Sequence, residues 1–311
     1  MEFVEALQVR NFEFLRRTPK SDLHNHATRG GNIRDFLNDI DLPQRNFRSL
    51  DEMQYWYDSN VKYLFSGREG FISRVKSAFK QAKNDGVTRL ALSFGIGDSI
   101  HFTNIEEYLA ELKSIQHSIA PEINFIPELC LGRTDNIEPV EEMFEEVLSY
   151  GFFKSIDLVG DDRLPVSNYK NIYRKAKRNG YILKAHLGEF GDAESIRKGV
   201  NDLELDEVQH GISAVTSRDV MHWLRDNDVQ LNVCPSSNVM LNRVNSYEKH
   251  PIKELFYHGI RVTINSDDML IFDQSVTQDY LNLYDSGCLS ATDLNVVRGF
   301  GLDPSCSQAD D

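Results

Sequence analysis

The sequence has few cysteines and no closely spaced pair of them. Its 311 residues contain four, which are far apart along the chain: Cys130, Cys234, Cys288 and Cys306. A disulfide framework or a thiolate zinc site needs cysteines at close, regular spacings, so both are disfavoured. A reducing, cytoplasmic compartment fits this cysteine usage best.

Long hydrophobic runs and an excess of basic residues are also missing. No apolar run approaches the roughly 20 residues that a membrane-spanning helix needs. The first 17 residues lack the apolar core of a signal peptide. Lysine and arginine number 34 against 48 acidic residues, which gives a net charge of -14. Because nucleic-acid-binding proteins carry a basic footprint, we expect neither a membrane nor a nucleic acid as partner. The oligomeric state stays open.

The sequence does contain a regular alternation of short β-branched runs with helix-like segments. The runs are mostly short and apolar, as expected for buried parallel strands. The eight strand candidates are Ser21–His26, Thr88–Phe94, Ile123–Cys130, Ser155–Leu158, Ile182–Ala185, Glu207–Gln209, Gln230–Val233 and Arg261–Ile264.

The segments between these runs have helical spacing and end at glycine. Phe71, Val75 and Phe79 fall on one helical face, and Gly86 follows just before the next strand candidate. Similar stops precede three later strands, at Gly151, Gly180 and Gly259. This rhythm predicts an α/β fold, a single (β/α)₈ TIM barrel over residues 1–311 with a polar tail at about 303–311. An open doubly wound sheet competes, but its usual glycine-rich phosphate loop is missing after the first strand.

Histidine and aspartate stand where several predicted strands end. His24 and His26 close the first, His186 follows the fifth, and Asp267 follows the eighth. Because barrel active sites lie at the C-terminal ends of the strands, we expect these side chains to converge. Two buried, hydrogen-bonded histidines would explain the first pair alone equally well. The full set predicts one Zn²⁺ per chain, or Fe²⁺ or another divalent ion in its place.

Together these motifs resemble the adenosine and AMP deaminase family of the amidohydrolase superfamily. The likeness covers roughly residues 18–273 and keeps the family's order. The resemblance implies a mononuclear zinc barrel that replaces the exocyclic amine of a purine with oxygen, and it implies the same four metal ligands. Four stretches carry it, Pro19–His26, His186–Glu189, His210–Gly211 and Asn265–Asp268, with weaker support from Asp157–Asp161 and Cys234–Asn238.

The resemblance also implies roles for residues that do not bind the metal. Glu189 matches the acid that protonates a purine ring nitrogen, and His210 matches the histidine that orients the attacking water. Asp268 matches a residue that hydrogen-bonds the imidazole-side nitrogen of the purine. Gly160 matches a glycine whose N–H contacts another ring nitrogen. Gly188 is also expected to bind the substrate. The chemistry is consistent, because a dry pocket raises the pKa of a carboxyl that must donate a proton.

Two departures from the family's pattern bear on the substrate. Thr28 stands where the family generally has an acidic residue that contacts the ribose, and Arg29 follows it. Arginine suits carboxylate or phosphate. Thr28 and Arg29 are therefore predicted to bind substrate, with tolerance for a substituent or negative charge beyond the purine. The segment between the first two strands also shows little of the family's helical lid pattern.

The sequence therefore predicts a zinc-dependent hydrolytic deaminase. It would act on the 6-amino group of an adenosine-like nucleoside, a 5′-modified nucleoside or a nucleotide. A deaminase of free adenine or of another aminated heterocycle remains an alternative. So does another metal hydrolase on the same barrel, acting on an amide or phosphate-ester bond, which would generally hold more than one ion. A non-catalytic binding protein is disfavoured, because no ligand and no acid is missing.

Overall fold

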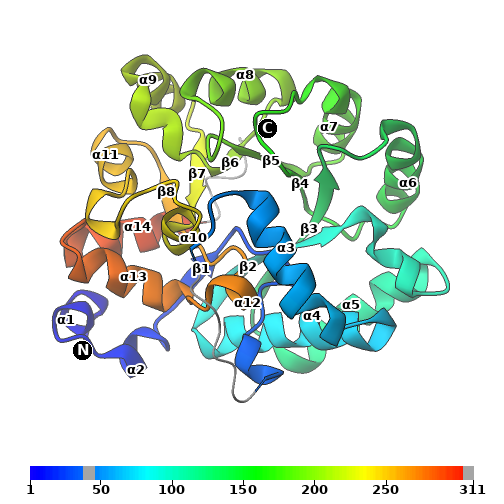
Figure 1. Cartoon of the computed structure of the whole chain (residues 1–311), viewed down its shortest axis with the longest axis horizontal. Helices are drawn as coiled ribbons and strands as arrows, with labels where there is room; N and C mark the ends of the chain where they lie inside the picture. The colour runs from blue at the N-terminus through cyan, green and yellow to red at the C-terminus, as the bar shows by residue number, and fades with distance from the viewer. Residues whose placement is uncertain (38–45, 304–311) are drawn as a thin grey trace.

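The structure, a computed structural model, describes residues 1–37 and 46–303. Eight parallel strands follow one another in chain order, each paired with the next, and form the ring at the centre of Figure 1. The predicted TIM barrel is confirmed. The strands are β1 (Lys20–Asp22), β2 (Val87–Gly95), β3 (Asn124–Gly132), β4 (Ser155–Val159), β5 (Ile182–Leu187), β6 (Glu207–His210), β7 (Gln230–Val233) and β8 (Val262–Ile264).

Helices surround this ring and connect the strands (Figure 1). In chain order they are α1 (Phe3–Gln8), α2 (Phe12–Leu15), α3 (Leu50–Asn60), α4 (Gly67–Asn84), α5 (Ile105–Ile119), α6 (Ile137–Ser149), α7 (Lys170–Arg178), α8 (Ala193–Leu203), α9 (Arg218–Asp226), α10 (Pro235–Met240), α11 (Ile252–Tyr257), α12 (Met269–Phe272), α13 (Val276–Asp285) and α14 (Ala291–Leu302). Short 3₁₀ turns are η1 (Ile33–Asp35), η2 (Lys62–Leu64), η3 (Ile96–His101), η4 (Ser167–Tyr169), η5 (Ile212–Thr216) and η6 (Tyr247–Lys249).

The predicted glycine stops fall directly after helices. In α4, Phe71, Val75 and Phe79 are fully buried, as their spacing predicts. The helix ends at Asn84, and Gly86 has a φ of +69°, a conformation in which glycine meets no steric penalty. The chain then enters β2 at once. The glycines after α6, α7 and α11 likewise have a positive φ and stand two residues beyond the helix end.

The first strand is shorter than predicted, and the difference concerns the site. β1 ends at Asp22, so His24 and His26 lie beyond it rather than within it. Beyond Asp22 the chain makes only isolated bridges, because each residue now pairs with a different neighbour: Asn25 with Asp267, and His26 with the end of β2. The Asp267 N–H donates to the His24 carbonyl at 2.9 Å. The two ends of the sheet therefore meet through the segments that carry the predicted ligands.

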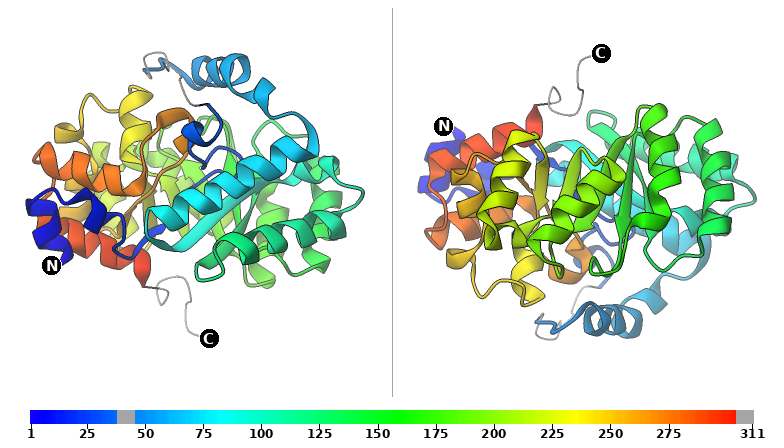
Figure 2. Two further views of the ribbon diagram at one scale, coloured as in Figure 1. Left: turned by 90° about the horizontal axis from the view of Figure 1, so that it is seen from below. Right: turned by 90° about the horizontal axis from the view of Figure 1, so that it is seen from above.

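The sequence analysis did not identify one of the two longer helices between the first two strands, α3. α3 spans eleven residues there, and its first turn is capped by the Ser49 side chain, which accepts the Glu52 N–H. Met53, Trp56 and Tyr57 are buried at helical spacing and pack with the apolar residues of α12. The acidic and amide residues between them obscure this short apolar stripe in the sequence. In Figure 2, α3 lies apart from the ring of helices, on one side of the barrel.

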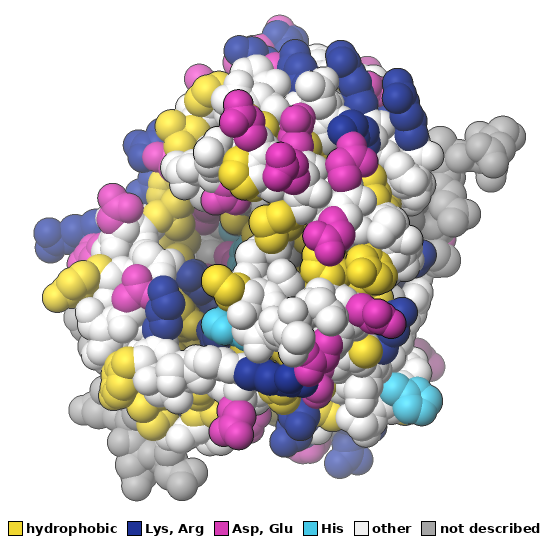
Figure 3. Space-filling view, turned by 90° about the vertical axis from the view of Figure 1, so that its right-hand side faces the viewer, with side chains coloured by type: hydrophobic (Ala, Val, Ile, Leu, Met, Phe, Trp, Pro, Cys, Tyr) yellow, Lys and Arg dark blue, Asp and Glu magenta, His cyan; other side chains and the backbone are white. Residues whose placement is uncertain are grey.

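The surface agrees with the charge pattern of the sequence. Figure 3 shows Lys and Arg side chains interspersed with Asp and Glu on the face at the right of Figure 1, without a large basic patch. Within residues 1–37 and 46–303, no helix is long and apolar enough to cross a membrane. Apart from residue 303, the predicted polar tail lies outside the described residues.

Candidate metal centre and active site

The four predicted metal ligands converge at one end of the barrel. The Nε2 atoms of His24 and His186 are 3.1 Å apart. The Asp267 Oδ1 lies 3.6 Å from the His24 Nε2 and 3.3 Å from the His26 Nε2. Ligands about 2.0–2.1 Å from a tetrahedral zinc ion are separated by about 3.3 Å. The donor atoms present therefore fit a single four-coordinate divalent ion.

The charges of this cluster also suit a cation. Burial alone would raise the pKa of Asp267, but His24, His26 and His210 outweigh it and hold that pKa well below its usual range. Burial would lower the pKa of His26, but Asp268 and Asp267 outweigh it and raise this pKa to about 9. In this cluster Asp267 supplies an ionised carboxylate, and His26 carries a proton that a bound divalent ion would displace.

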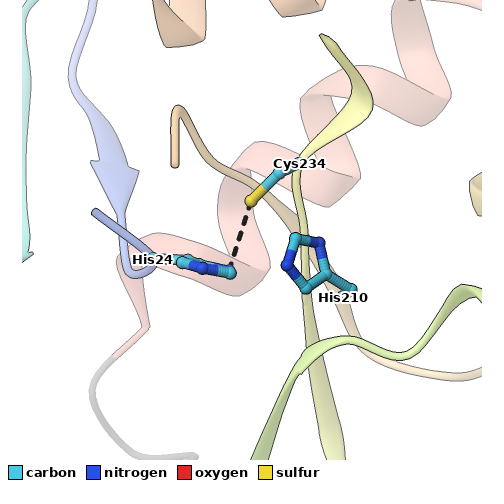
Figure 4. A group of neighbouring side chains, drawn as sticks. All are labelled: His24, His210 and Cys234. Carbon is cyan, nitrogen blue, oxygen red and sulfur yellow. Dashed lines mark hydrogen bonds between the residues drawn. The ribbon is translucent and has the colours of Figure 1, made fainter. Parts of the chain in front are cut away.

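Neighbouring side chains hold the histidine rings from behind. The His186 Nδ1 lies 3.1 Å from the Oδ2 of Asp157, which is fully buried in the middle of β4. The His24 Nδ1 lies 3.2 Å from the Cys234 sulfur and 3.4 Å from the Asn232 carbonyl, and Figure 4 shows the sulfur contact beside His210. Since Nδ1 is engaged in both rings, Nε2 is the nitrogen that faces the other ligands. Cys234 is buried, and its sulfur contacts the His24 ring at Nδ1 rather than at Nε2.

Glu189 and His210 lie side by side next to the ligand cluster. The His210 Nε2 is 3.6 Å from the Glu189 Oε2 and 3.9 Å from the Asp267 Oδ2. His210 has a φ of +65°, which is rare outside glycine and is typical of residues that a functional site constrains. On its other side, the His210 Nδ1 lies 3.1 Å from the side-chain nitrogen of Asn238.

The protonation of this pair suits acid–base chemistry. Burial raises the pKa of Glu189 well above its usual range, and the negative charges of Asp267 and Asp162 add to the effect. Burial lowers the pKa of His210 to about 3. These shifts favour a protonated Glu189, which can donate a proton, beside a neutral His210. The Glu189 Oε1 is buried and has no hydrogen-bond partner among the described residues, so it is available to a ligand.

The predicted substrate-binding residues have different local settings. Gly188 is buried with a φ of +71°, and a Cβ there would lie 2.4 Å from an Ile196 methyl carbon. Gly160 has a φ of +103°, which also requires glycine. Thr28 is partly exposed. The Oδ1 of the buried Asp268 has no hydrogen-bond partner within the described part of the chain.

Sequence reasoning missed several residues that support the site. Asp162 accepts the backbone N–H groups of Glu189, Phe190 and Gly191, which holds the turn after β5 in place. Arg133, at the end of β3, donates to the His186 carbonyl. The supporting roles of Asp157, Cys234 and Asn238 were missed as well. Position was the available signal for Arg133 and Cys234, which directly follow β3 and β7, since such places face the barrel mouth.

Comparison with known proteins identifies the family. A model of the adenosine deaminase family matches residues 130–310, more than half of the chain. A Treponema pallidum protein named for adenosine/adenine deaminase activity is 30% identical over 288 residues, which cover 91% of this chain and 96% of that protein.

Two solved structures share the fold. One is the N6-methyl-AMP deaminase of Arabidopsis thaliana, with a TM-score of 0.79, 18% identity, and coverage of 96% of this chain and 95% of that one. The other is a Burkholderia ambifaria amidohydrolase with bound zinc, with a TM-score of 0.77, 15% identity, and coverage of 96% and 88%. The chain therefore belongs to the adenosine deaminase family of the amidohydrolase superfamily, and it is an aminohydrolase that acts on C–N bonds of cyclic amidines.

Proposed function

We propose that this protein is a metal-dependent hydrolytic deaminase of a 6-aminopurine compound, with an adenosine-like nucleoside as its leading substrate. The observation that carries the proposal is a buried Glu189, with a raised pKa and an unpaired Oε1, beside a cluster suited to one divalent ion. Deamination at an aromatic carbon requires both features, since hydroxide must add to the carbon and the adjacent ring nitrogen must receive a proton.

In this proposal His24, His26, His186 and Asp267 hold the ion. Zinc is the leading candidate, because three imidazoles and one carboxylate suit it and the Burkholderia ambifaria relative contains it. When bound, the ion supplies a nucleophile at neutral pH by lowering the pKa of water toward about 7. Asp157 and Cys234 keep the Nε2 atoms of His186 and His24 directed at it.

The protein's own residues then position the purine and move its protons. Glu189 donates its proton to the ring nitrogen next to the amino-bearing carbon. His210, neutral and beside Glu189, orients the attacking water and accepts its proton. Asp268 presents its unpaired Oδ1 to the imidazole side of the purine, and Gly160 offers a backbone N–H to the ring. His210 passes the proton taken from water to the amino group, which leaves as ammonia. The hydroxyl proton on the carbon returns to Glu189, and the carbon keeps the oxygen as a carbonyl.

The proposal also concerns which group, if any, is attached to the purine of the substrate. Relatives and structural neighbours are named for adenosine, adenine and N6-methyl-AMP, so the family leaves this group open. Thr28, in place of the usual acidic residue, removes a negative charge from the predicted sugar-binding position. This change favours tolerance of a 5′-substituent or a nucleotide.

An ammonia-release assay tests the function directly. Zinc-loaded protein is incubated with adenine, adenosine, a 5′-substituted adenosine and AMP, and kcat/KM is compared. We expect release from at least one of them, lost on removal of the metal and in Glu189→Gln. If loaded, folded protein releases no ammonia from any 6-aminopurine, the proposal is wrong.

A further inference from the structure

The Arg29 guanidinium contacts three other side chains of the protein. Its Nη1 lies 3.1 Å from the Asp268 Oδ2, and its Nη2 donates to the Gln54 Oε1 at 2.7 Å. Its guanidinium carbon lies 4.5 Å from the centre of the Tyr57 ring. The side chain is only 24% exposed. Arg29 therefore bridges a residue of the site and two residues of α3.

Two side chains of α3 contact Arg29, in addition to the apolar packing of α3 against α12. Gln54 and Tyr57 are one turn apart on α3, and both contact Arg29. The Tyr57 hydroxyl accepts a hydrogen bond from Arg74 of α4 at 2.8 Å. Neither contact of Arg29 with α3 could form if the helix moved away from the mouth of the barrel.

The contact with Asp268 uses one carboxylate oxygen and leaves the other available. Oδ2 receives Arg29, and Oδ1 is buried without a hydrogen-bond partner in the described part of the chain. The backbone links the same segments, since the Leu270 N–H donates to the Arg29 carbonyl at 2.6 Å. The orientation of the Asp268 carboxylate therefore depends on a side chain that α3 holds in place.

We propose that Arg29 is a positioning residue that ties α3 to Asp268, so that α3 must lie over the site for Asp268 to present its free oxygen to the substrate. The proposal rests on the proposed function for the role of Asp268. It differs from the prediction that Arg29 binds an anionic substituent, because the guanidinium already faces the Asp268 carboxylate. Its effect is then independent of the charge on the substrate.

The test compares Arg29→Met and Arg29→Lys with wild type. Methionine removes both hydrogen bonds and the ion pair, whereas lysine keeps the charge and loses the planar fork. Losing a charged hydrogen bond costs about tenfold or more in kcat/KM. We expect this loss for Arg29→Met to fall mainly on KM, to be similar for adenosine and AMP, and to leave the metal content unchanged. Arg29→Lys should restore part of it.

Two further measurements separate positioning from general damage. Hydrogen exchange of the α3 amides should accelerate at least about tenfold in Arg29→Met. Gln54→Leu should weaken kcat/KM in the same direction and add little to Arg29→Met. Arg34→Ala is the matched control. Arg34, a few residues after Arg29, makes an ion pair at 2.7 Å with Asp273, which directly follows α12, and the Arg34 side chain is exposed. We expect this control to leave kinetics and α3 exchange unchanged.

The outcomes are decisive in both directions. A lower kcat at unchanged KM would indicate loss of active protein and overturn the proposal. A loss confined to AMP would show that Arg29 contacts the substrate directly, and it would also overturn it. If Arg29→Met does not fold, Gln54→Leu must reproduce the faster α3 exchange. If wild type deaminates no purine, the proposed function fails, while α3 exchange still tests the link between Arg29 and α3.

Discussion

Two buried carboxyl groups of this site differ in the charge that their surroundings favour. Asp267 and Glu189 are both buried carboxyls, yet their pKa values move in opposite directions. Histidines surround Asp267 and lower its pKa, whereas burial and nearby carboxylates raise that of Glu189. Such divergence between two neighbouring acids is what the proposed roles of Asp267 as ligand and Glu189 as general acid require.

Glu189→Gln tests the general acid. Glutamine keeps the size of the side chain and cannot deliver a proton, so kcat should fall roughly 10²–10⁴-fold. Metal content, measured by elemental analysis, should stay at about one ion per chain. Near-normal turnover in this variant would show that another group protonates the ring.

Asp267→Asn tests the ligand. It replaces an anionic oxygen with a neutral amide at the residue that contacts two of the histidines. We expect metal affinity to fall at least about tenfold, because ligands bind in their deprotonated, charged form. Competition with a chelator measures this affinity. Two or more tightly bound ions in wild type would contradict the mononuclear assignment.

At the scale of elements, glycines and strand ends made the barrel predictable. Each glycine stop marks where a helix ends before a strand, and this depends only on local backbone conformation. That the four proposed ligands lie together was predictable because strand ends converge in any such barrel. α3 was missed because its apolar stripe is short and interrupted by charged residues.

The partners across long sequence separations were not predictable in this way. Arg29 and Asp268 are 239 positions apart, and His24 and Cys234 are 210 apart. Strand order brings such segments to the same end of the barrel. It does not determine which side chains touch, because that depends on loop conformations and rotamers that no periodic pattern encodes.

The segment that holds His24 and His26 offers an element-scale test. A Cβ on Gly30 would lie 1.8 Å from the Asn25 Oδ1. The Asn25 amide bonds Asp22 at 3.0 Å and Ser266 at 2.9 Å. Gly30→Ala must therefore displace Asn25, which stands between the two histidines.

We expect Gly30→Ala to lower the free energy of unfolding by about 1–3 kcal/mol and to weaken metal binding. Gly97→Ala is the control, since a Cβ there meets no atom within 4 Å. Denaturant unfolding and a metal titration measure both effects. Unchanged metal affinity in Gly30→Ala would show that this segment does not need Asn25 in place.

For the whole molecule, buried carboxyls make stability depend on pH. Asp279 of α13 is buried against Ser236 of α10, and burial raises its pKa to about 7 from an ordinary value of 3.8. The folded chain therefore binds this proton more tightly than the unfolded chain. The resulting stability is fully present at low pH and is lost as pH rises toward 7.

Asp279→Asn should remove this dependence. Between pH 5 and 7, the group lowers the wild-type free energy of unfolding by about 2 kcal/mol, because each pKa unit corresponds to about 1.4 kcal/mol. Metal-free protein unfolded in urea across this range should show a flatter profile in the variant. Asp285→Asn, on the exposed side of the same helix, is the control. Parallel profiles for wild type and Asp279→Asn would contradict the assignment.

The central claim is that this barrel replaces a purine amino group with oxygen from water. The most direct measurement is turnover of the 6-aminopurine panel by zinc-loaded protein in ¹⁸O-labelled water, with the product analysed by mass spectrometry. The account predicts ammonia release and a product purine that carries one heavy oxygen, with neither formed by Glu189→Gln. The contrary result is a loaded, folded wild type that leaves every 6-aminopurine unchanged, or that forms a product without the label.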